Sequence, residues 1–256
     1  MLPPQAGIPR DPAEYTGTMP TALLVIPTYN EADNLPSLLE AILQAVDIHV
    51  AVMDDASPDG TADAAERVLV SSPGSRVVRR TGPRGYGLAC LEGFEIALQE
   101  GYDYILTMDA DWSHDPNNLP QILDALHDGA DLVIGSRYCN GISVVNWPLR
   151  RVLLSVFANS YVRAILRLPV TDCTSGYRGY SARALRVANL SRVVSDGYAF
   201  LVEIATRVHR GGLILREIPI IFIERRAGQS KMSKRVMFES ALTPWRLLFT
   251  RLHLRK

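Results

Sequence analysis

Two aspartates one residue apart, at the end of an apolar run, are the side chains best suited to chemistry in this sequence. The run from Tyr104 to Pro116 reads YILTMDADWSHDP and contains Asp109 and Asp111. Its apolar part predicts a buried strand, and side chains two positions apart leave a strand on the same side. Because adjacent carboxylates repel each other, we expect a hard cation such as Mg²⁺ or Mn²⁺, which prefers oxygen ligands and keeps positions for substrate phosphates. The alternative is an exit turn that caps the next helix.

The charge of the chain is balanced overall but divided between its halves. The 256 residues include 27 Lys and Arg against 27 Asp and Glu. Residues 1–128 hold 6 basic against 20 acidic side chains, whereas residues 129–256 hold 21 against 7. An acidic half suits metal binding, and a basic half suits a phosphate, a nucleic acid or an anionic membrane surface. Since no nucleic-acid-binding motif accompanies the basic half, we expect no nucleic-acid partner.

Cysteine spacing and apolar segments narrow the class of protein further. The three cysteines lack CxxC spacing, which indicates neither a zinc site nor a disulfide framework and favours a reducing compartment. Residues 1–20 have no apolar segment typical of a secretory signal, so we expect a mobile tail. The best apolar stretch, Val152 to Leu168, is interrupted by two arginines and falls short of the roughly 20 apolar residues that span a membrane. We therefore expect a soluble or peripheral protein.

Strands and helices alternate along the first half of the sequence. Short apolar runs predict strands at 21–27, 49–53, 76–80, 131–135 and at the run that begins at 104. Apolar residues at helical spacing and turn signals predict helices at 33–46, 61–71, 88–99 and 116–127. This alternation predicts an α/β fold with a Rossmann-like, mostly parallel sheet and helices on both faces. Ligands of such sheets bind outside the carboxyl ends of the strands.

Polar clusters follow four different strands and are expected to meet in one crevice. They are Tyr29 to Glu31, Asp54 with Asp55, Arg84, and the pair Asp109 and Asp111. The carboxylates of Asp54 and Asp55 can accept hydrogen bonds from a nucleotide base and its ribose. Arg84 can face a diphosphate that the metal bridges. The alternative for residues 54–61 is a tight turn before a helix.

Five short segments resemble, in order and spacing, the family 2 inverting glycosyltransferases with a GT-A fold. More narrowly, the chain resembles the polyprenol (dolichol) phosphate mannosyltransferases over roughly residues 21–235. The segments are PTYNE at 27–31, DDASPDGT at 54–61, DAD at 109–111, GSRY at 135–138 and GQSKM at 228–232. The resemblance implies transfer of mannose from GDP-mannose to a polyprenyl monophosphate with inversion, which gives a β-mannosyl phospholipid.

The same resemblance implies a role for each residue that matches a family motif. Nucleotide-sugar binding would fall to Pro27, Tyr29, Glu31, Asp54, Asp55, Arg84, Asp109 and Lys231. Metal binding would fall to Asp109, Asp111 and Ser113, where Ser113 stands at a position that is a Gln ligand in some relatives. Acceptor-phosphate binding would fall to Arg137, Arg151 and Ser155, and the catalytic set would be Asp109, Asp111, Arg137 and Arg225. Asp172 matches a segment that borders the sugar site, with a capping Asp in a turn as the alternative.

The implied chemistry needs alignment and charge control more than a strong base. A phosphate acceptor is already a nucleophile at neutral pH. Arginines would hold the lipid phosphate, and the metal would stabilise the GDP leaving group. This division matches the charges, because residues 21–128 would bind nucleotide sugar and metal and residues 129–235 would bind the acceptor. We also do not interpret Arg178 as a plain surface charge.

Two stretches that mix basic and apolar residues are expected near a membrane surface. Residues 144–168 and 231–256 interleave Arg and Lys with Trp, Phe and Leu, which is typical of an interfacial helix. We expect residues 236–256 to form a basic amphipathic helix, with a terminal helix docked on the core as the alternative. A lipid acceptor implies a peripheral protein at the cytoplasmic face of the membrane, where an integral membrane partner protein can supply an anchor.

Two other functions stay open at this point. A related enzyme would transfer glucose or another sugar from a UDP-sugar to the same lipid phosphate, since base specificity lies in a few hydrogen bonds. The second is a non-catalytic nucleotide-sugar binding subunit. The intact DAD and GSRY segments argue against a non-catalytic subunit.

Overall fold

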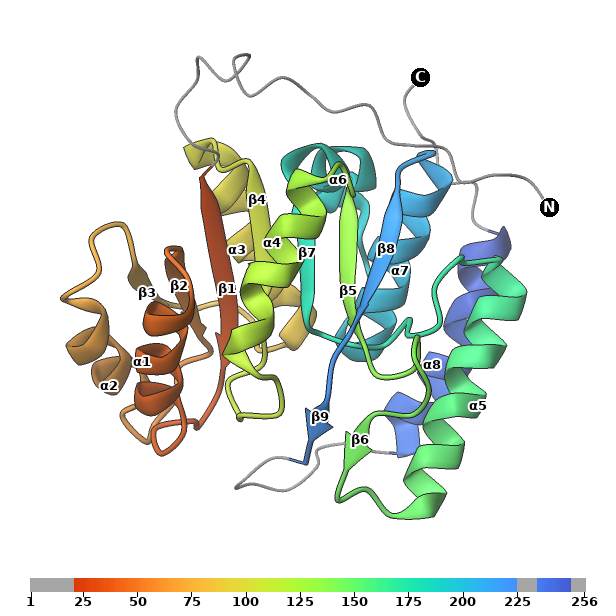
Figure 1. The fold of residues 1–256 in the computed structure, drawn as a ribbon, viewed down its shortest axis with the longest axis horizontal. Coiled ribbons are helices and arrows are strands. Elements are labelled where there is room, and N and C mark those ends of the chain that lie inside the picture. The colour runs from red at the N-terminus through yellow and green to blue at the C-terminus, as the bar shows by residue number, and fades with distance from the viewer. Residues whose placement is uncertain (1–20, 225–233, 250–256) are drawn as a thin grey trace.

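A seven-stranded sheet forms the centre of the molecule in a computed structural model that describes residues 21–224 and 234–249. The strand order is β3-β2-β1-β4-β7-β5-β8 (Figure 1). Every neighbouring pair is parallel except those made by β7, which runs antiparallel between β4 and β5. The predicted mostly parallel α/β sheet is therefore confirmed.

The elements follow the predicted alternation closely in the first half of the chain. The strands of the large sheet are β1 (Ala22–Thr28), β2 (His49–Asp54), β3 (Arg76–Arg79), β4 (Tyr104–Thr107), β5 (Leu132–Ser136), β7 (Arg178–Ser181) and β8 (Leu215–Pro219). Two short strands, β6 (Val144–Val145) and β9 (Phe222–Ile223), form a separate parallel pair. The helices are α1 (Leu35–Ala45), α2 (Thr61–Leu69), α3 (Tyr86–Glu100), α4 (Leu119–His127), α5 (Leu149–Leu166), α6 (Ala182–Ala188), α7 (Gly197–Arg210) and α8 (Lys234–Phe249). All predicted strands and helices of the first half are present, whereas β6 to β9 were not predicted.

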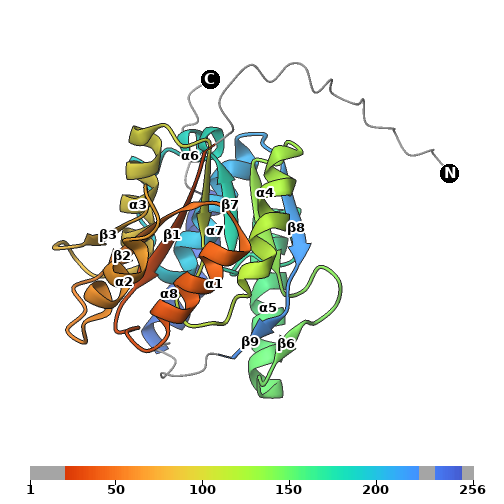
Figure 2. The same ribbon diagram turned by 60° about the vertical axis from the view of Figure 1, so that its left-hand side comes forward.

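Helices cover both faces of the sheet, as predicted (Figures 1 and 2). Along β1, Leu23 and Val25 belong to the core on one face, and Leu24 and Ile26 belong to the core on the other. All four side chains are fully buried, which explains why this strand is continuously apolar rather than alternating. Helices α1, α2 and α4 pack on the second of these faces, and α3, α6 and α7 pack on the first.

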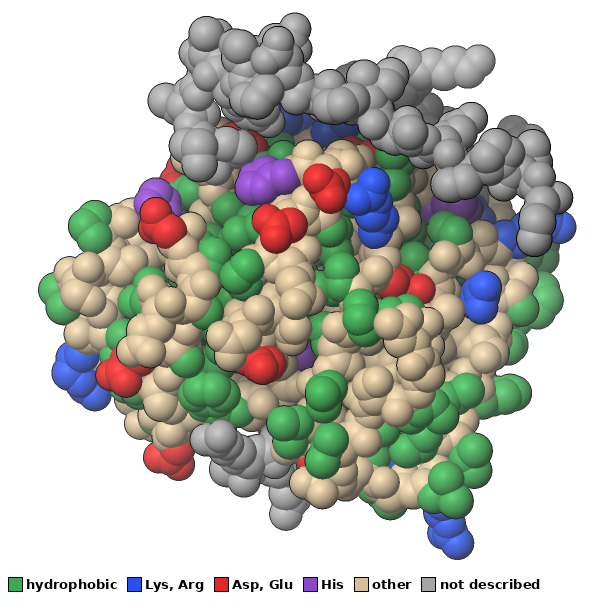
Figure 3. Space-filling model, in the orientation of Figure 1, with side chains coloured by type: hydrophobic (Ala, Val, Ile, Leu, Met, Phe, Trp, Pro, Cys, Tyr) green, Lys and Arg blue, Asp and Glu red, His purple; other side chains and the backbone are tan. Residues whose placement is uncertain are grey.

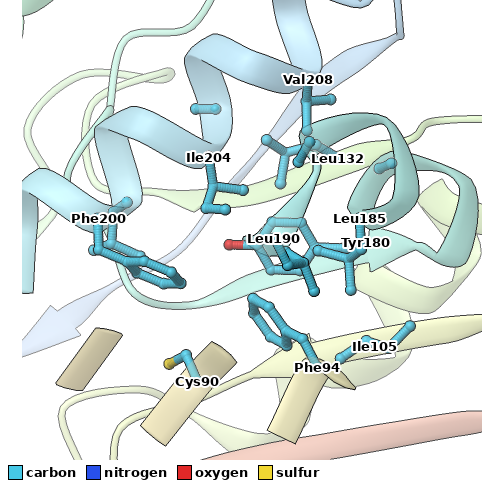
Figure 4. Close-up of a cluster of buried hydrophobic side chains, with 14 of the residues drawn as sticks. Cys90, Phe94, Ile105, Leu132, Tyr180, Leu185, Leu190, Phe200, Ile204 and Val208 are labelled. Atoms are coloured by element: carbon cyan, nitrogen blue, oxygen red, sulfur yellow. The ribbon is translucent and has the colours of Figure 1, made fainter. Parts of the chain in front are cut away.

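An aromatic cluster fixes α3 and α7 to the sheet (Figure 4). The ring of Phe94 on α3 lies 5.2 Å from that of Tyr180 on β7 and 6.2 Å from that of Phe200 on α7, measured between centroids. Aromatic pairs at such separations add directional attraction to the burial of apolar surface. This packing holds the amino ends of α3 and α7 at the carboxyl edge of the parallel strands.

The reversed strand β7 brings a turn to that same edge. Because β7 is antiparallel to β4, with Thr107 opposite Arg178, the residues that precede β7 arrive where β4 ends. Residues 172–177 therefore lie beside the carboxyl ends of β4 and β5. The acidic and basic halves of the chain meet at this turn.

The terminal helix α8 docks against α5 and α7. The side chain of Leu247 is buried, and its carbonyl accepts a hydrogen bond of 2.9 Å from Arg210. The indole of Trp245 donates to the hydroxyl of Tyr161 on α5 at 2.7 Å. The docked alternative is thus correct for residues 242–249. The tail predicted at 1–20 and the end of the helix predicted at 236–256 fall outside the described residues, and no described helix has the length and apolar character to cross a membrane.

Candidate active site

Hydrogen bonds join the loops that follow β1 and β2. The backbone N–H of Asn30 donates to Ser57 Oγ at 3.0 Å, and that of Glu31 donates to Thr61 Oγ1 at 2.9 Å. The buried Asp54 accepts the N–H of Ser57 at 3.0 Å. The turn that was the alternative interpretation of residues 54–61 is therefore present, and it also connects the two predicted nucleotide loops.

Arg84 brings the loop after β3 to the same place. Its Nη1 donates to the Tyr29 hydroxyl at 2.7 Å, and its Cζ lies 4.3 Å from the centre of the Tyr29 ring. Its Nη2 lies 3.5 Å from the carbonyl of Ala56, in the loop after β2. Pro27 lies opposite Met53, and each is the last residue but one of its strand, next to these loops. Three of the four polar clusters that were predicted to converge, those after β1, β2 and β3, therefore lie together.

Asp55 is already engaged within the protein. One oxygen forms an ion pair with the buried Arg80, and the other accepts the N–H of Gly85 at 3.0 Å. Arg80 also donates to Glu92 on α3 at 2.8 Å. A nucleoside would have to share the Asp55 carboxylate with these groups. The sequence interpretation missed Arg80, because nothing distinguishes it from its exposed neighbour Arg79.

The end of β4 carries the predicted carboxylate pair. Asp111 is 7% exposed, and its Oδ1 accepts hydrogen bonds from Ser113, at 3.1 Å from the backbone N and 2.5 Å from Oγ. Ser113, predicted as a metal ligand, orients Asp111 in this structure. Asp109 is half-buried and follows the same strand. Among the described residues no group of three His, Cys, Asp or Glu could hold a metal, but two carboxylates fit a hard divalent cation completed by phosphate and water oxygens.

His114 contacts the backbone of Asp109, and the sequence interpretation did not identify it. Its ring is buried and stacks on Tyr177, with centroids 4.8 Å apart. Burial lowers its pKa to about 4, with the Arg137 charge acting in the same direction and the Asp111 charge opposing it. The imidazole is therefore neutral near pH 7. Because its Nδ1 lies 3.3 Å from the backbone N of Asp109 and accepts that hydrogen, we assign the ring proton to Nε2.

Gly176 in the turn before β7 lies against Asp109. Its carbonyl accepts a hydrogen bond of 2.7 Å from Thr107 Oγ1, at the end of β4. A Cβ at this position would lie 2.7 Å from the Tyr86 hydroxyl and 3.1 Å from Asp109 Oδ1. A side chain at this position would therefore require the Tyr86 hydroxyl, and to a smaller extent the Asp109 carboxylate, to move.

Arg178 fixes the same turn from inside the protein. Its side chain is fully buried, and it donates to the carbonyls of Ser175 at 2.7 Å, Cys173 at 2.8 Å and Leu201 at 2.7 Å. The expectation that Arg178 is not a surface charge is correct. Its contacts make it a residue that positions the turn.

Arg137 and Asp172 form a buried ion pair beside this turn. The Nε and Nη2 atoms of Arg137 each lie 2.7 Å from a different oxygen of Asp172. Burial raises the pKa of Asp172, but the charge and hydrogen bonds of Arg137 outweigh it, so the pKa lies below the usual value of 3.8. Asp172 also accepts the N–H groups of Thr174 and Ser175, as the capping alternative predicts.

The predicted acceptor residues gather around Trp147. The Cζ atom of Arg151 lies 4.0 Å from the centre of the Trp147 ring, and that of Arg137 lies 5.5 Å from it. Ser155, one turn after Arg151 on α5, accepts a hydrogen bond of 2.7 Å from the Tyr138 hydroxyl. Arg137, Arg151 and Ser155 are thus brought together. The other predicted residues of the second half, Arg225 and Lys231, lie outside the described residues.

Comparison with known proteins gives close relatives. The model of the glycosyl transferase family 2 matches residues 23–187. The polyprenol monophosphomannose synthase of Mycolicibacterium smegmatis is 44% identical over 231 residues, which cover 90% of this chain and 87% of that protein. The undecaprenyl-phosphate mannosyltransferase of Micrococcus luteus is 44% identical over 228 residues, with coverage of 88% and 93%. The dolichol-phosphate mannosyltransferase of Pyrococcus furiosus is 34% identical over 229 residues, with coverage of 88% and 63%.

Solved structures share the fold at lower sequence identity. The glucosyl-3-phosphoglycerate synthase of Mycobacterium tuberculosis, crystallised with Mn²⁺, UDP and phosphoglyceric acid, superposes with a TM-score of 0.65 at 21% identity. The match covers 88% of this chain and 78% of that chain. The predicted GT-A type of α/β fold is confirmed. With the family model matching more than half of its residues and relatives 44% identical along most of its length, the chain belongs to glycosyl transferase family 2.

Proposed function

We propose that this chain is an inverting glycosyltransferase that moves mannose from GDP-mannose to a polyprenyl monophosphate. The observation that carries the proposal is the turn at residues 172–176, which links the acceptor arginine cluster to the carboxylate pair. Asp172 at one end of the turn holds Arg137, and Gly176 at the other end lies against Asp109. The names of the three relatives, all mannose transferases acting on polyprenyl or dolichyl phosphates, support the same donor sugar and acceptor class.

The donor would lie over the carboxyl ends of β1 to β4. Pro27, Tyr29, Glu31, Asp54 and Asp55 would hold the nucleoside, and Arg84 would approach the diphosphate from its exposed position beside Tyr29. Asp109 and Asp111 would hold Mg²⁺ or Mn²⁺, with Ser113 orienting Asp111. When bound, the metal supplies positive charge that stabilises the diphosphate leaving group. Arg225 and Lys231 complete the proposed set on the resemblance of their segment.

The acceptor phosphate would be aligned by the arginines on the other side of the turn. Arg151 and Ser155 lie one turn apart on α5, and the Cζ atoms of Arg151 and Arg137 both lie within 5.5 Å of the centre of the Trp147 ring. Two guanidinium groups can orient a phosphate anion in line with the anomeric carbon. Because a phosphate oxygen is already nucleophilic, the described residues need supply no strong base, and orientation gives inversion.

The lipid acceptor requires contact with a membrane surface. Large apolar side chains are exposed on α5 and α8, among them Leu149 at 71%, Phe157 at 68% and Phe249 at 75%. Figure 3 shows apolar side chains gathered at the lower right, over β6 and α5, near the carboxyl edge of the sheet. Arginines flank these side chains, which is typical of an interfacial surface. We propose a peripheral location at the cytoplasmic face of the membrane, with an integral membrane protein as a further anchor.

The experiment that tests this function uses purified full-length protein, labelled GDP-mannose, Mn²⁺ or Mg²⁺ and short polyprenyl phosphates. A mannosylated lipid and free GDP are expected, and both should disappear after addition of a chelator. UDP-glucose in place of GDP-mannose tests the alternative donor, since UDP release would then exceed GDP release. Binding of GDP-mannose without any lipid product would instead indicate a non-catalytic subunit. An Asp111→Asn variant should bind acceptor normally and give no product.

A further inference from the structure

The two arginines of the proposed acceptor site are neutralised by carboxylates of very different kinds. Arg137 pairs with Asp172, and the side chains are 6% and 0% exposed. Arg151 pairs with Glu224, and these side chains are 33% and 28% exposed. Glu224 comes directly after β9. One arginine is thus paired inside the protein and the other at its surface.

The carboxylate of Asp172 cannot move away from Arg137 without also losing the hydrogen bonds that form the turn. It accepts two hydrogen bonds from the guanidinium and further ones from the backbone N–H groups of Thr174 and Ser175. Removing one partner from a buried pair leaves an uncompensated buried charge, which is strongly unfavourable. An incoming phosphate would therefore meet Arg137 with Asp172 still bound.

Glu224, in contrast, is held by an exchangeable contact. Half-exposed ion pairs contribute little free energy, because water and salt compete with them. Its backbone N–H donates to the carbonyl of Val145 at 3.2 Å, so the β9 end can stay in place while the carboxylate rotates away. A phosphate monoester carries more negative charge than a carboxylate and offers more acceptor oxygens. It is the stronger ligand for the same guanidinium.

Arg151 is also fixed independently of Glu224. Its guanidinium lies over the Trp147 indole, with Cζ 4.0 Å from the ring centre. A cation over an aromatic face is attracted by the ring quadrupole. The Trp147 ring therefore helps to keep the Arg151 guanidinium in place when Glu224 is displaced. The Nε1 of Trp147 is buried and, within the described part of the chain, has no hydrogen-bond partner. The indole N–H of Trp147 is therefore a further hydrogen-bond donor close to the Arg151–Glu224 pair.

We infer that Glu224 occupies the position of the acceptor phosphate on Arg151 and is displaced when the phosphate monoester binds. The inference rests on the proposed function, because it concerns the acceptor of that reaction. Glu224 then acts as an internal competitor that lowers the apparent affinity for the acceptor. The apparent dissociation constant equals the intrinsic one divided by the fraction of molecules in which Arg151 is not paired with Glu224.

The test measures binding of farnesyl phosphate to the full-length chain by titration calorimetry. Removing the competitor in Glu224→Gln should lower the dissociation constant roughly 1.5- to 5-fold, the range expected for a half-exposed ion pair. The same change should appear with inorganic phosphate and be absent with farnesol, which lacks the anion. Glu100→Gln is the matched control, because Glu100 forms an ion pair of similar exposure with Arg76 at the opposite edge of the sheet.

A double-variant cycle separates exchange on Arg151 from a general charge effect. In an Arg151→Gln background, Glu224→Gln should no longer tighten binding of farnesyl phosphate. Tightening that persists in this background, or binding that is unchanged or weaker in Glu224→Gln alone, would overturn the inference while leaving the proposed function intact. Failure of the unmodified chain to bind farnesyl phosphate at all would overturn the proposed acceptor and the inference together.

Discussion

The guanidinium of Arg137 and the carboxylate of Asp172 face each other in a two-point ion pair, with both N–O distances at 2.7 Å. Asp172 has no exposed surface, and it also accepts the N–H of Ser175 at 3.1 Å. The ion pair therefore has two structural roles. It orients Arg137, which we propose holds the acceptor phosphate, and it shapes the turn that leads to Gly176 beside Asp109.

Asp172→Asn is expected to destabilise the protein strongly. The change leaves the Arg137 charge buried without its partner, a situation that typically costs about 3–5 kcal/mol. Urea unfolding followed by circular dichroism measures the difference. Asp63→Asn is the control, because Asp63 pairs with Arg79 at the surface, where solvent screens the pair, and its loss should change the free energy of unfolding little. Equal losses in the two variants would contradict the structural role of Asp172.

The same carboxylate predicts a dependence of stability on acid. Burial raises the pKa of Asp172, but Arg137 and the hydrogen bonds lower it further, so the folded pKa lies below the ordinary value of 3.8. The ionised group therefore stabilises the fold above about pH 4, and this contribution is lost as the pH falls through the folded pKa. The free energy of unfolding should fall less steeply below pH 4 in Asp172→Asn than in the unmodified chain. Parallel pH profiles would argue against this assignment.

Gly176→Ala should reduce turnover by about 10- to 100-fold, because small displacements of reacting groups have effects of this size. The new Cβ would lie 2.7 Å from the Tyr86 hydroxyl and 3.1 Å from Asp109 Oδ1, so one of the two must move. Tyr86→Phe removes the nearer atom and should restore part of the activity of Gly176→Ala. Mannosyl-lipid formation in the single and double variants measures this. Full activity in Gly176→Ala would show that the close approach is unimportant.

Ser113→Ala separates orientation from ligation. In the structure Ser113 Oγ donates to Asp111 Oδ1 at 2.5 Å, and the backbone N–H of Ser113 supports the same oxygen. Loss of one hydrogen bond to a charged group is worth about 1.5–3 kcal/mol at most. We expect the metal concentration for half-maximal activity to rise by about 10-fold. Inactivation as complete as in Asp111→Asn would instead indicate that Ser113 binds the metal directly.

The exposed face of α5 predicts the strength of membrane binding. Leu153 and Phe157 are 60% and 68% exposed, and each would bury apolar surface in a bilayer interface. The double change Leu153→Gln with Phe157→Gln should reduce co-sedimentation with anionic vesicles by about 10-fold or more. Val70→Gln on the distant α2 end, where the side chain is 85% exposed, should leave binding unchanged. We prefer these substitutions to a deletion of α8, because the deletion would also remove the buried side chain of Leu247 and so affect stability.

Much of the first half of the chain was predictable because three of its strands, β1, β2 and β4, are largely buried. A continuous apolar run such as 23–26 is typical of a strand that is buried on both faces of a parallel sheet. The polar residues that follow such strands then lie together at the carboxyl edge of that sheet. Tyr29 and Arg84 meet there as expected. The interactions of Asp55 could not be foreseen, because its partner Arg80 is recognisable only once the strand ends are placed side by side.

The second half was less predictable because its strands depend on tertiary contacts. The sequence of β7, RGYS, begins with an arginine whose charge is satisfied by buried carbonyls. It continues with Gly179, where a Cβ would lie 2.5 Å from a methyl carbon of Ile122. Neither feature is typical of a central strand in isolation. Arg137 likewise meets Asp172 across 35 positions of sequence, and local pattern carries no information about that pair.

The placement of β7 also has a consequence for how the chain acquires its fold. Strand β4 pairs with β7, which lies more than 70 residues later in the chain, with Tyr104 opposite Ser181 and Thr107 opposite Arg178. Strand β5 is made earlier than β7 but joins β4 only through it. During synthesis the acidic half would expose the edge of β4 until residue 181 has emerged, and pairing over such separations is slow. The two halves differ in charge and in proposed ligand, yet neither can close its sheet alone. We therefore expect them to fold and unfold as one cooperative unit.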